Sequence, residues 1–217
     1  MIRFNKAPIN PQYLYGMTTA AKPWQLDSWF SSDERLHNLY PAAVQPMAGK
    51  HWTPLNVARM AVQFLVPAAG ARVLDIGSGV GKFCLSGAYY KPYAFFHGVE
   101  QRRELAGYAE MARNTLGLFN VSFSHGNFTQ LNLRHYDHIY FFNSFYENLV
   151  GTDKIDDTIQ YSPALFNYYN RYLYKQLDQM PAGTRVVTFH SLGEEMPSCY
   201  EMVQIEVEDS LKFYIKI

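Results

Sequence analysis

The sequence predicts an α/β fold, a doubly wound and mostly parallel sheet of seven strands with a C-terminal antiparallel hairpin. Three observations carry this prediction. Apolar, strand-like runs alternate with helix-like segments between residues 71 and 190, as in parallel strands joined by right-handed crossovers. The first of these runs ends in a glycine-rich turn. The last two runs alternate apolar with polar residues and lie close together, which is typical of a hairpin.

The alternating units can be placed along the chain. The helix over residues 54–66 has one apolar face; Thr53 is expected to cap it and Pro54 to take its first position. Because strands joined in this way pair in parallel, helices must cover both faces of the sheet. The expected strands are residues 71–76, 94–100, 121–125, 137–142 and 184–190, and the further helices are about 80–90, 102–116 and about 162–179.

The hairpin at the C-terminus has a predicted register. Directly opposed residues share a face, so the two apolar sets align only if the loop has an odd number of residues. We therefore predict that Val207 pairs with Leu211 and that Glu206 lies opposite Lys212, around a loop of residues 208–210.

Residues 1–50 are expected to form an N-terminal extension to one domain at 51–217. Five prolines, at positions 8, 11, 23, 41 and 46, exclude one long helix. One short helix is predicted, with Ser31 as N-cap and Glu34 three residues later. The aromatic residues Trp24, Trp29, Phe30 and Tyr40 cluster around it. They fit either a flap fixed to the core or a lid over a ligand site, and both readings can hold together.

Composition narrows the class of protein. The 217 residues include 19 basic and 19 acidic side chains, and this balance disfavours a nucleic-acid binder that works through a broad basic field. Two cysteines are too few for a disulfide framework or a metal cluster. No run reaches membrane-spanning length and no signal-peptide pattern is seen, so we expect a cytoplasmic protein without a membrane partner. No His, Asp or Glu set has metal-ligand spacing.

The glycine-rich turn is the centre of the functional prediction. It reads Asp75-Ile76-Gly77-Ser78-Gly79-Val80-Gly81-Lys82. A dinucleotide-binding turn would need glycine at Lys82, and a phosphate-binding P-loop would need glycine at Ile76, so both fail. The remaining pattern, Asp-x-Gly-x-Gly-x-Gly, resembles the first motif of the class I S-adenosylmethionine-dependent methyltransferases. The parallel strands followed by a hairpin also match the seven-stranded, Rossmann-like sheet of that class.

This resemblance implies a ligand site for S-adenosylmethionine at the carboxyl ends of the strands. The glycines are expected to bring backbone N–H groups to the amino-acid part of the ligand, with Asp75 holding the loop. Glu100, at the next strand tip, is expected to accept both ribose hydroxyls, and Asn127 and Phe128 to meet the adenine. The cofactor-binding candidates are Trp52, Thr53, Asp75, Gly77, Ser78, Gly79, Gly81, Glu100, Gln101, Asn127, Phe128 and Asn143.

The tip of the fourth strand, Asn143-Ser144-Phe145-Tyr146-Glu147, carries the predicted catalytic residues Asn143 and Tyr146. It matches the ends of the Asn-Pro-Pro-Tyr motif of amine- and amide-directed methyltransferases. It is also similar to the Asn-Asn-Phe loop of the non-SET histone-lysine methyltransferases of the telomeric-silencing disruptor type. Further matches to that family span about residues 73–148, at 75–81, 98–100, 108–110 and 126–128. The family's flanking regions are absent, so histone is a poor substrate hypothesis.

We therefore predict an enzyme that methylates an amine, on a protein side chain or a small molecule. An apolar channel would lower the pKa of the amine, and Phe145, Tyr146, Trp52 and Tyr140 are candidate walls. The Asn143 oxygen would aim the amine, and Glu147 is read as a solvated loop charge. His51 is the histidine expected near the pocket mouth. Two alternatives stay open: a small-molecule O- or ring-N-methyltransferase whose acceptor site residues 1–50 shape, and an S-adenosylmethionine-binding protein without transfer activity. Nucleic acid is disfavoured as acceptor.

Overall fold

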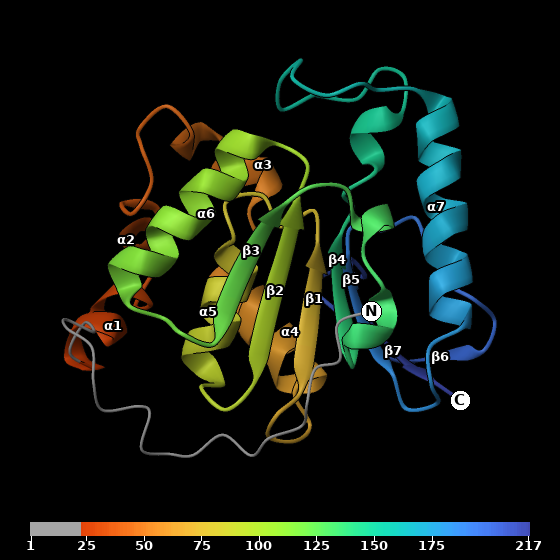
Figure 1. Cartoon of the computed structure of the whole chain (residues 1–217), viewed down its shortest axis with the longest axis horizontal. Coiled ribbons are helices and arrows are strands. Elements are labelled where there is room, and N and C mark those ends of the chain that lie inside the picture. Colours follow the sequence, from red (N-terminus) through yellow and green to blue (C-terminus); the bar gives the residue numbers. More distant parts are fainter. Residues whose placement is uncertain (1–22) are drawn as a thin grey trace, which may run out of the picture.

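A seven-stranded sheet runs through the computed structural model, which describes residues 23–217 (Figure 1). The strand order is β3-β2-β1-β4-β5-β7-β6. Strands β1 to β5 pair in parallel, and β7 lies antiparallel between β5 and β6. The predicted fold class is confirmed. The strands are β1 Arg72–Ile76, β2 Phe95–Glu100, β3 Val121–His125, β4 His138–Phe142, β5 Arg185–Phe189, β6 Tyr200–Glu206 and β7 Leu211–Lys216.

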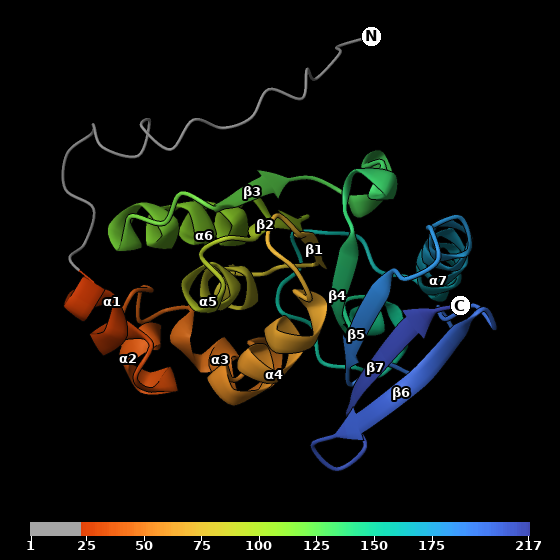
Figure 2. The same ribbon diagram turned by 90° about the horizontal axis from the view of Figure 1, so that it is seen from below.

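Helices cover both faces of this sheet, and each face has its own buried core. Figure 2 shows α4, α5 and α6 on one side and α7 on the other. Alternate residues of one strand point to the two cores: Val73 packs with the first set of helices and Leu74 with α7. The helices are α4 Leu55–Leu65, α5 Lys82–Tyr90, α6 Arg103–Leu116 and α7 Pro163–Asp178. None of the described helices is both long and apolar enough to cross a membrane.

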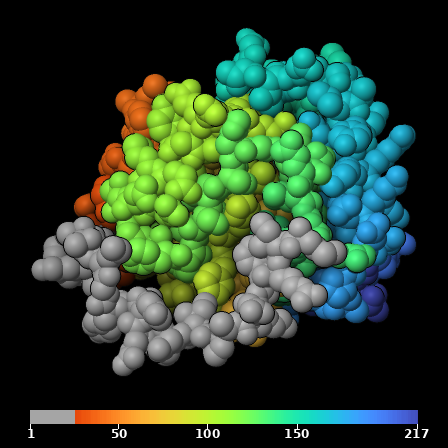
Figure 3. Space-filling model, viewed as in Figure 1, coloured from red at the N-terminus to blue at the C-terminus, as the bar shows by residue number. Residues whose placement is uncertain are grey.

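The order in which successive strands are added to the sheet reverses between β1 and β4. From β1 the chain builds outward to β3 on one side, and β4 then continues on the other side. Ligands of doubly wound sheets bind outside the carboxyl ends of the strands at such a switch point. At this edge the segment between β4 and α7 lies beside helix α6 (Figure 3).

The start of α4 differs from the prediction. Pro54 is the N-cap, and Thr53 makes no capping bond. The Thr53 hydroxyl instead shares a buried hydrogen bond of 2.9 Å with the Tyr140 hydroxyl. The first N–H of the helix, from Leu55, donates to the Asp33 carboxylate at 3.1 Å. A side chain from the N-terminal segment therefore takes the capping role predicted for Thr53.

The described part of the N-terminal segment packs on α5. It contains α1 Pro23–Trp29, α2 Asp33–His37, the 3-10 helix η2 Gln45–Met47 and α3 Ala48–His51. Phe30 stacks on Tyr89, with ring centroids 4.2 Å apart, and the buried Tyr40 hydroxyl donates to the Val80 carbonyl at 3.0 Å. The predicted residues Pro8 and Pro11 and the side chain of Trp24 lie outside the described part.

The predicted N-cap of the short helix is wrong by one residue. Ser32 caps α2, with its hydroxyl accepting from the Arg35 N–H at 3.2 Å. The Ser31 hydroxyl donates backward to the Ser28 carbonyl at 2.8 Å. Two adjacent serines offer the same chemistry, and the end of the preceding helix decides between them.

The C-terminal hairpin is confirmed, but its predicted register is wrong. Glu206 pairs with Leu211 and Ile205 with Lys212, which leaves a loop of residues 207–210. Strand β6 is the edge of the sheet and most of it is exposed, so burial of its apolar residues does not fix the register. An irregularity between Met202 and Gln204 shifts the pairing further along.

Candidate active site

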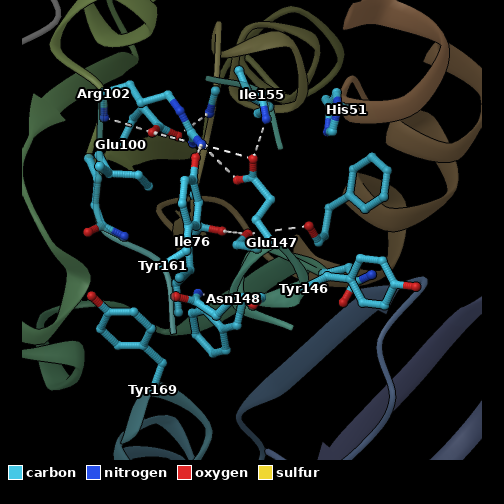
Figure 4. Close-up of a pocket in the computed structure, with 18 of the residues that line it drawn as sticks. His51, Ile76, Glu100, Arg102, Tyr146, Glu147, Asn148, Ile155, Tyr161 and Tyr169 are labelled. Atoms are coloured by element: carbon cyan, nitrogen blue, oxygen red, sulfur yellow. Dashed lines mark hydrogen bonds and ion pairs between the residues drawn. The ribbon is translucent and has the colours of Figure 1, made fainter. Parts of the chain in front are cut away.

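A cavity of about 640 Å³ opens at the carboxyl edge of the sheet, at the switch between β1 and β4 (Figure 4). This volume lies in the range of small-molecule and cofactor sites. The tips of β1 to β5, the segment before α4 and the segment between β4 and α7 all contribute to its walls. Of the predicted site residues, Trp52, Gly77, Gly79, Glu100, Gln101, Phe128, Asn143 and Tyr146 line it.

The glycine turn after β1 gives the cavity a wall of bare backbone. Gly77, Gly79 and Gly81 all have positive φ, at 75°, 53° and 82°. A Cβ on Gly79 would have no atom within 4 Å, so this glycine leaves open space. A Cβ on Gly81 would collide with Phe123 and Ala109. Gly81 therefore permits close packing of α5 and α6 on the sheet, and it does not line the cavity.

The N–H groups of this turn are used inside the protein. Those of Gly77 and Ser78 donate to the Val99 carbonyl at 2.9 and 3.0 Å, and that of Gly81 donates to the Ser78 carbonyl at 2.8 Å. The Gly79 N–H donates to the Glu100 carboxylate at 3.0 Å. The prediction that these N–H groups meet a ligand does not fit this geometry. The turn instead allows a ligand to approach the backbone closely, and its carbonyl oxygens can accept hydrogen bonds from that ligand.

Glu100 presents a buried carboxylate at the tip of β2. The residue is 5% exposed, and it accepts from the backbone N–H groups of Gly79 and Arg102, the latter at 2.8 Å. Burial raises its pKa, and the two backbone bonds together with the Arg102 charge oppose this rise. A carboxylate has about four acceptor sites. Glu100 can therefore still accept hydrogen bonds from two hydroxyl groups of a ligand.

The tip of β3 contributes an aromatic wall. Phe128 is buried at the cavity and stacks on Phe145, with ring centroids 5.2 Å apart. Asn127 does not line the cavity, because its amide is occupied elsewhere. Its oxygen caps the Thr129 N–H at 3.0 Å, and its nitrogen donates to Gln101 and to the Tyr169 hydroxyl at 3.1 and 2.9 Å. Asn127 therefore shapes the wall from behind.

The tip of β4 places the two predicted catalytic residues at the cavity. Asn143 adopts a left-handed backbone conformation with φ 42°, which is unusual for a residue other than glycine. Tyr146 is 41% exposed and lies at the same end. Phe145, between them, points into the core and also forms part of the cavity floor.

Three of the predicted residues lie behind the turn. Thr53, Asp75 and Ser78 line a small hollow next to the main cavity, and Trp52 and Gly77 line both. Asp75 does not hold the loop's backbone as predicted; its carboxylate accepts from the Cys84 thiol at 3.6 Å. Burial raises the pKa of Asp75 to about 8.

Tyr140 is not a wall of the main cavity, so that part of the prediction is wrong. It is 1% exposed and stacks on Phe83, with ring centroids 3.7 Å apart. Its position in the middle of a central strand places it in the core.

The N-terminal segment and the segment after β4 meet at the mouth of the cavity. Met47, Lys50 and His51 line it, and the Lys50 ammonium pairs with Asp153 across the opening at 2.5 Å. His51 lies at the cavity as predicted, and burial lowers its pKa. Its ring is therefore neutral near pH 7 and can accept a proton.

Sequence reasoning missed the charged residues of the cavity. Arg102 is buried and pairs with Glu147, which was predicted to be solvated, and with Asp156. The sequence pattern gives no sign that an arginine after an acidic strand tip is buried, because arginine at such a position is usually exposed. His190 was also missed. It follows β5 with φ 52° and lines the cavity, a position that the strand-tip rule could have identified.

Comparison with known proteins agrees with this fold. Residues 67–172, just under half of the chain, match a family model described as a methyltransferase domain. An RNA methyltransferase from Salinibacter ruber, solved with S-adenosyl-L-homocysteine, is similar at 18% identity and a TM-score of 0.53, over 76% of this chain and 91% of that one. TrmN from Thermus thermophilus is similar at 18% identity and a TM-score of 0.55, over 78% of this chain and 51% of that one.

A third solved structure, the putative methyltransferase yhhF from Escherichia coli, is similar at 13% identity and a TM-score of 0.53. The match covers 74% of this chain and 84% of that one. No curated protein sequence matches the chain. The fold is therefore that of these solved methyltransferases, and residues 67–172 match a methyltransferase domain model.

Proposed function

We propose that this protein transfers the methyl group of S-adenosylmethionine to an amine nitrogen, on a lysine-like protein side chain or a small molecule. One observation carries the proposal. A single cavity is lined by the glycine turn, by the buried carboxylate of Glu100 and by Asn143. These are the groups that an adenosyl ligand and a nucleophile beside it would need.

The residues present fit this cofactor. Glu100 would accept the two ribose hydroxyls, and Phe128 would pack on the adenine. Because the N–H groups of the turn are already used, its carbonyl oxygens would face the ammonium of the amino-acid part. The open space over Gly79 permits that approach. When bound, S-adenosylmethionine would supply a methyl group on a cationic sulfur, which an acceptor lone pair displaces in line.

Asn143 and Tyr146 would act on the acceptor. A solvated lysine amine has a pKa of about 10.4, and burial among apolar walls favours its neutral form. The side-chain oxygen of Asn143 can then accept a hydrogen bond from the amine and direct its lone pair. The ring of Tyr146 lies at the same end and favours a cationic centre by cation–π attraction. Positioning of this kind is the main source of acceleration for an in-line transfer.

Similarity to the core of the telomeric-silencing disruptor type supports an amine acceptor. It rests on the residues at 75–81, 98–100 and 126–128, and on Asn143. In this proposal the main domain is residues 51–217, and the described part of residues 1–50 shapes the acceptor end through Met47 and Lys50. The balanced charge argues against a nucleic-acid acceptor.

One observation favours a second function, O- or ring-N-methylation of a small molecule. His51 and His190 both line the cavity, and the lowered pKa of His51 keeps its ring in the neutral form that a general base requires. A hydroxyl acceptor needs such a base more than an amine does. A protein that binds S-adenosylmethionine without transfer is the third reading, and it predicts that neither histidine nor Asn143 affects function.

Substitution of Asn143 tests the proposal. Glycine is the preferred replacement because it accepts the positive φ of this position while removing the amide. We expect Asn143→Gly to retain cofactor binding and to lose transfer to amines by about a hundredfold. His51→Gln is the matched comparison, and it should leave amine transfer largely intact. Loss of transfer in His51→Gln, with activity retained in Asn143→Gly, would favour the second function.

A further inference from the structure

Arg102 joins two walls of the cavity that are far apart in the sequence. Its side chain is 5% exposed. One guanidinium nitrogen donates to both carboxylate oxygens of Glu147 at 2.9 Å and to the Tyr161 hydroxyl at 2.6 Å. The Nε atom donates to Asp156 at 3.2 Å. Figure 4 shows these contacts converging at the centre of the site.

The same residue is tied to the carboxylate proposed to bind ribose. The backbone N–H of Arg102 donates to Glu100 at 2.8 Å, and the guanidinium lies 3.7 Å from the same Glu100 oxygen. Glu100 and the pair Glu147 and Asp156 therefore share one buried cation. Buried charge networks of this kind depend on every partner, because removing one leaves an uncompensated charge.

Glu147 in turn organises the segment between β4 and α7. It stands in the short helix η5, Tyr146–Asn148, directly after the predicted catalytic residues. Its carboxylate accepts from the Ile155 N–H at 2.6 Å, and its backbone carbonyl accepts from the Lys154 ammonium. The position of residues 147–161 over the cavity thus depends on the charge of Glu147 and on its pairing with Arg102.

We infer that Arg102 is a positioning residue that couples ligand binding at Glu100 to the placement of residues 147–161 beside Asn143 and Tyr146. This inference rests on the proposed function. Hydroxyl groups bound to Glu100 compete with its long contact to the guanidinium. The Arg102 cation is then shared mainly between Glu147 and Asp156, and those bonds strengthen. Ligand binding at Glu100 therefore stabilises the position of residues 147–161, and by thermodynamic linkage a fixed position of residues 147–161 raises the affinity for the ligand.

Hydrogen exchange measured by mass spectrometry tests this coupling without any acceptor. The full-length protein is compared with and without saturating S-adenosylhomocysteine, together with Glu147→Gln and Arg102→Lys. Lysine keeps the charge but cannot form the forked bonds of a guanidinium. Arg113→Gln is the control, because Arg113 lies in α6, the helix that follows Arg102, in a partly exposed pair with Glu110 at 2.9 Å.

In the wild type and in Arg113→Gln, we expect the ligand to slow exchange both around residues 77–81 and over residues 147–161. In Glu147→Gln and Arg102→Lys, protection near 77–81 should remain and protection over 147–161 should disappear. Affinity for S-adenosylhomocysteine should fall by about 5- to 20-fold in both variants.

Retained protection of residues 147–161 in both variants would overturn the coupling while leaving the proposed function intact. Absence of any ligand effect in the wild type would overturn both. If Arg102→Lys does not fold, Glu147→Gln and Asp156→Asn decide the question, because Asp156 is 34% exposed and its loss is better tolerated.

Discussion

The side chain of Ser144 occupies the space in which a side chain at Gly77 would stand. A Cβ on Gly77 would overlap both the Cβ and the hydroxyl oxygen of Ser144. That hydroxyl donates to the Ile76 carbonyl at 2.5 Å. The tips of β1 and β4 are therefore locked together at the point where strand order reverses, and this contact sets the distance between the glycine turn and Asn143.

The contact predicts an unusually large effect for Gly77→Ala. Positive φ alone costs an alanine about 1 kcal/mol, and the collision with Ser144 adds about 1–3 kcal/mol. Gly70→Ala is a matched control, because Gly70 has φ 82° and open space around a Cβ. Chemical denaturation should show Gly77→Ala to be the more destabilised, with Ser144→Gly restoring part of the loss. Equal losses in the two alanine variants would show that the contact is unimportant.

Asp33 is predicted to stabilise the N-terminal segment through the buried Lys82. The Lys82 side chain is 3% exposed and contacts the Asp33 carboxylate and, at 3.0 Å, the His37 ring. Because Asp33 is partly exposed, we expect Asp33→Asn to cost about 1–3 kcal/mol at neutral pH. Asp153→Asn, in an exposed pair, should leave the melting temperature unchanged.

The loss in Asp33→Asn should shrink at alkaline pH. Burial lowers the pKa of Lys82, so the unfolded state binds its proton more tightly than the folded state. Stability then rises with pH through the lowered pKa, since the neutral amine needs no partner. Denaturation curves at pH 7, 8.5 and 9.5 measure this, and a loss that does not change with pH would contradict the account.

Asp75 is predicted to make stability fall as pH rises. Burial raises its pKa to about 8, so its contribution is complete below about pH 4 and is lost as pH rises through about 8. The isosteric Asp75→Asn carries no charge at any pH. Between pH 5 and 8.5 the free energy of unfolding should shift in favour of the variant by about 4 kcal/mol, because the linkage of about 1.4 kcal/mol per pH unit acts over roughly three units. Parallel pH profiles for the two proteins would rule out a buried, protonated Asp75.

Affinity for S-adenosylhomocysteine should fall in acid because Glu100 must be ionised to accept two hydroxyls. Burial raises the pKa of Glu100 above its ordinary value of 4.5, so the decline begins at a higher pH than for an exposed glutamate. Below that pKa the affinity should drop about tenfold per pH unit. In Glu100→Gln the affinity should be lower and independent of pH over the same range. An acid decline of equal size in the variant would assign it to another group.

The main elements of this fold could be predicted because their signals are local. The buried run ending at Asp75 and the alternation around Phe213 each specify a strand without knowledge of its neighbours. The register of the hairpin could not be predicted, because Val203 and Ile205 are 46% and 40% exposed and alternation on an edge strand does not report burial.

The site was predictable where a strand ends in a polar residue, as at Glu100 and Asn143. Contacts between side chains that are distant in the sequence could not be predicted. Asn127 seemed free to bind a ligand, but Tyr169, from the distant helix α7, takes its amide hydrogen. Arg102 and Glu147 are 45 residues apart in the sequence, and they form their ion pair only because the fold places β2 and β4 on either side of β1.

Calorimetric titration of the purified protein with S-adenosylhomocysteine tests the central claim most directly. If the cavity between the glycine turn and Asn143 holds this ligand, the wild type will bind one equivalent with a Kd on the order of micromolar, about −8 kcal/mol. Glu100→Gln, shown by circular dichroism to be folded at the titration temperature, will bind at least about tenfold more weakly because a charge-assisted hydrogen bond is lost. No heat of binding to the wild type, or equal affinity in Glu100→Gln, would contradict the assignment of this cavity.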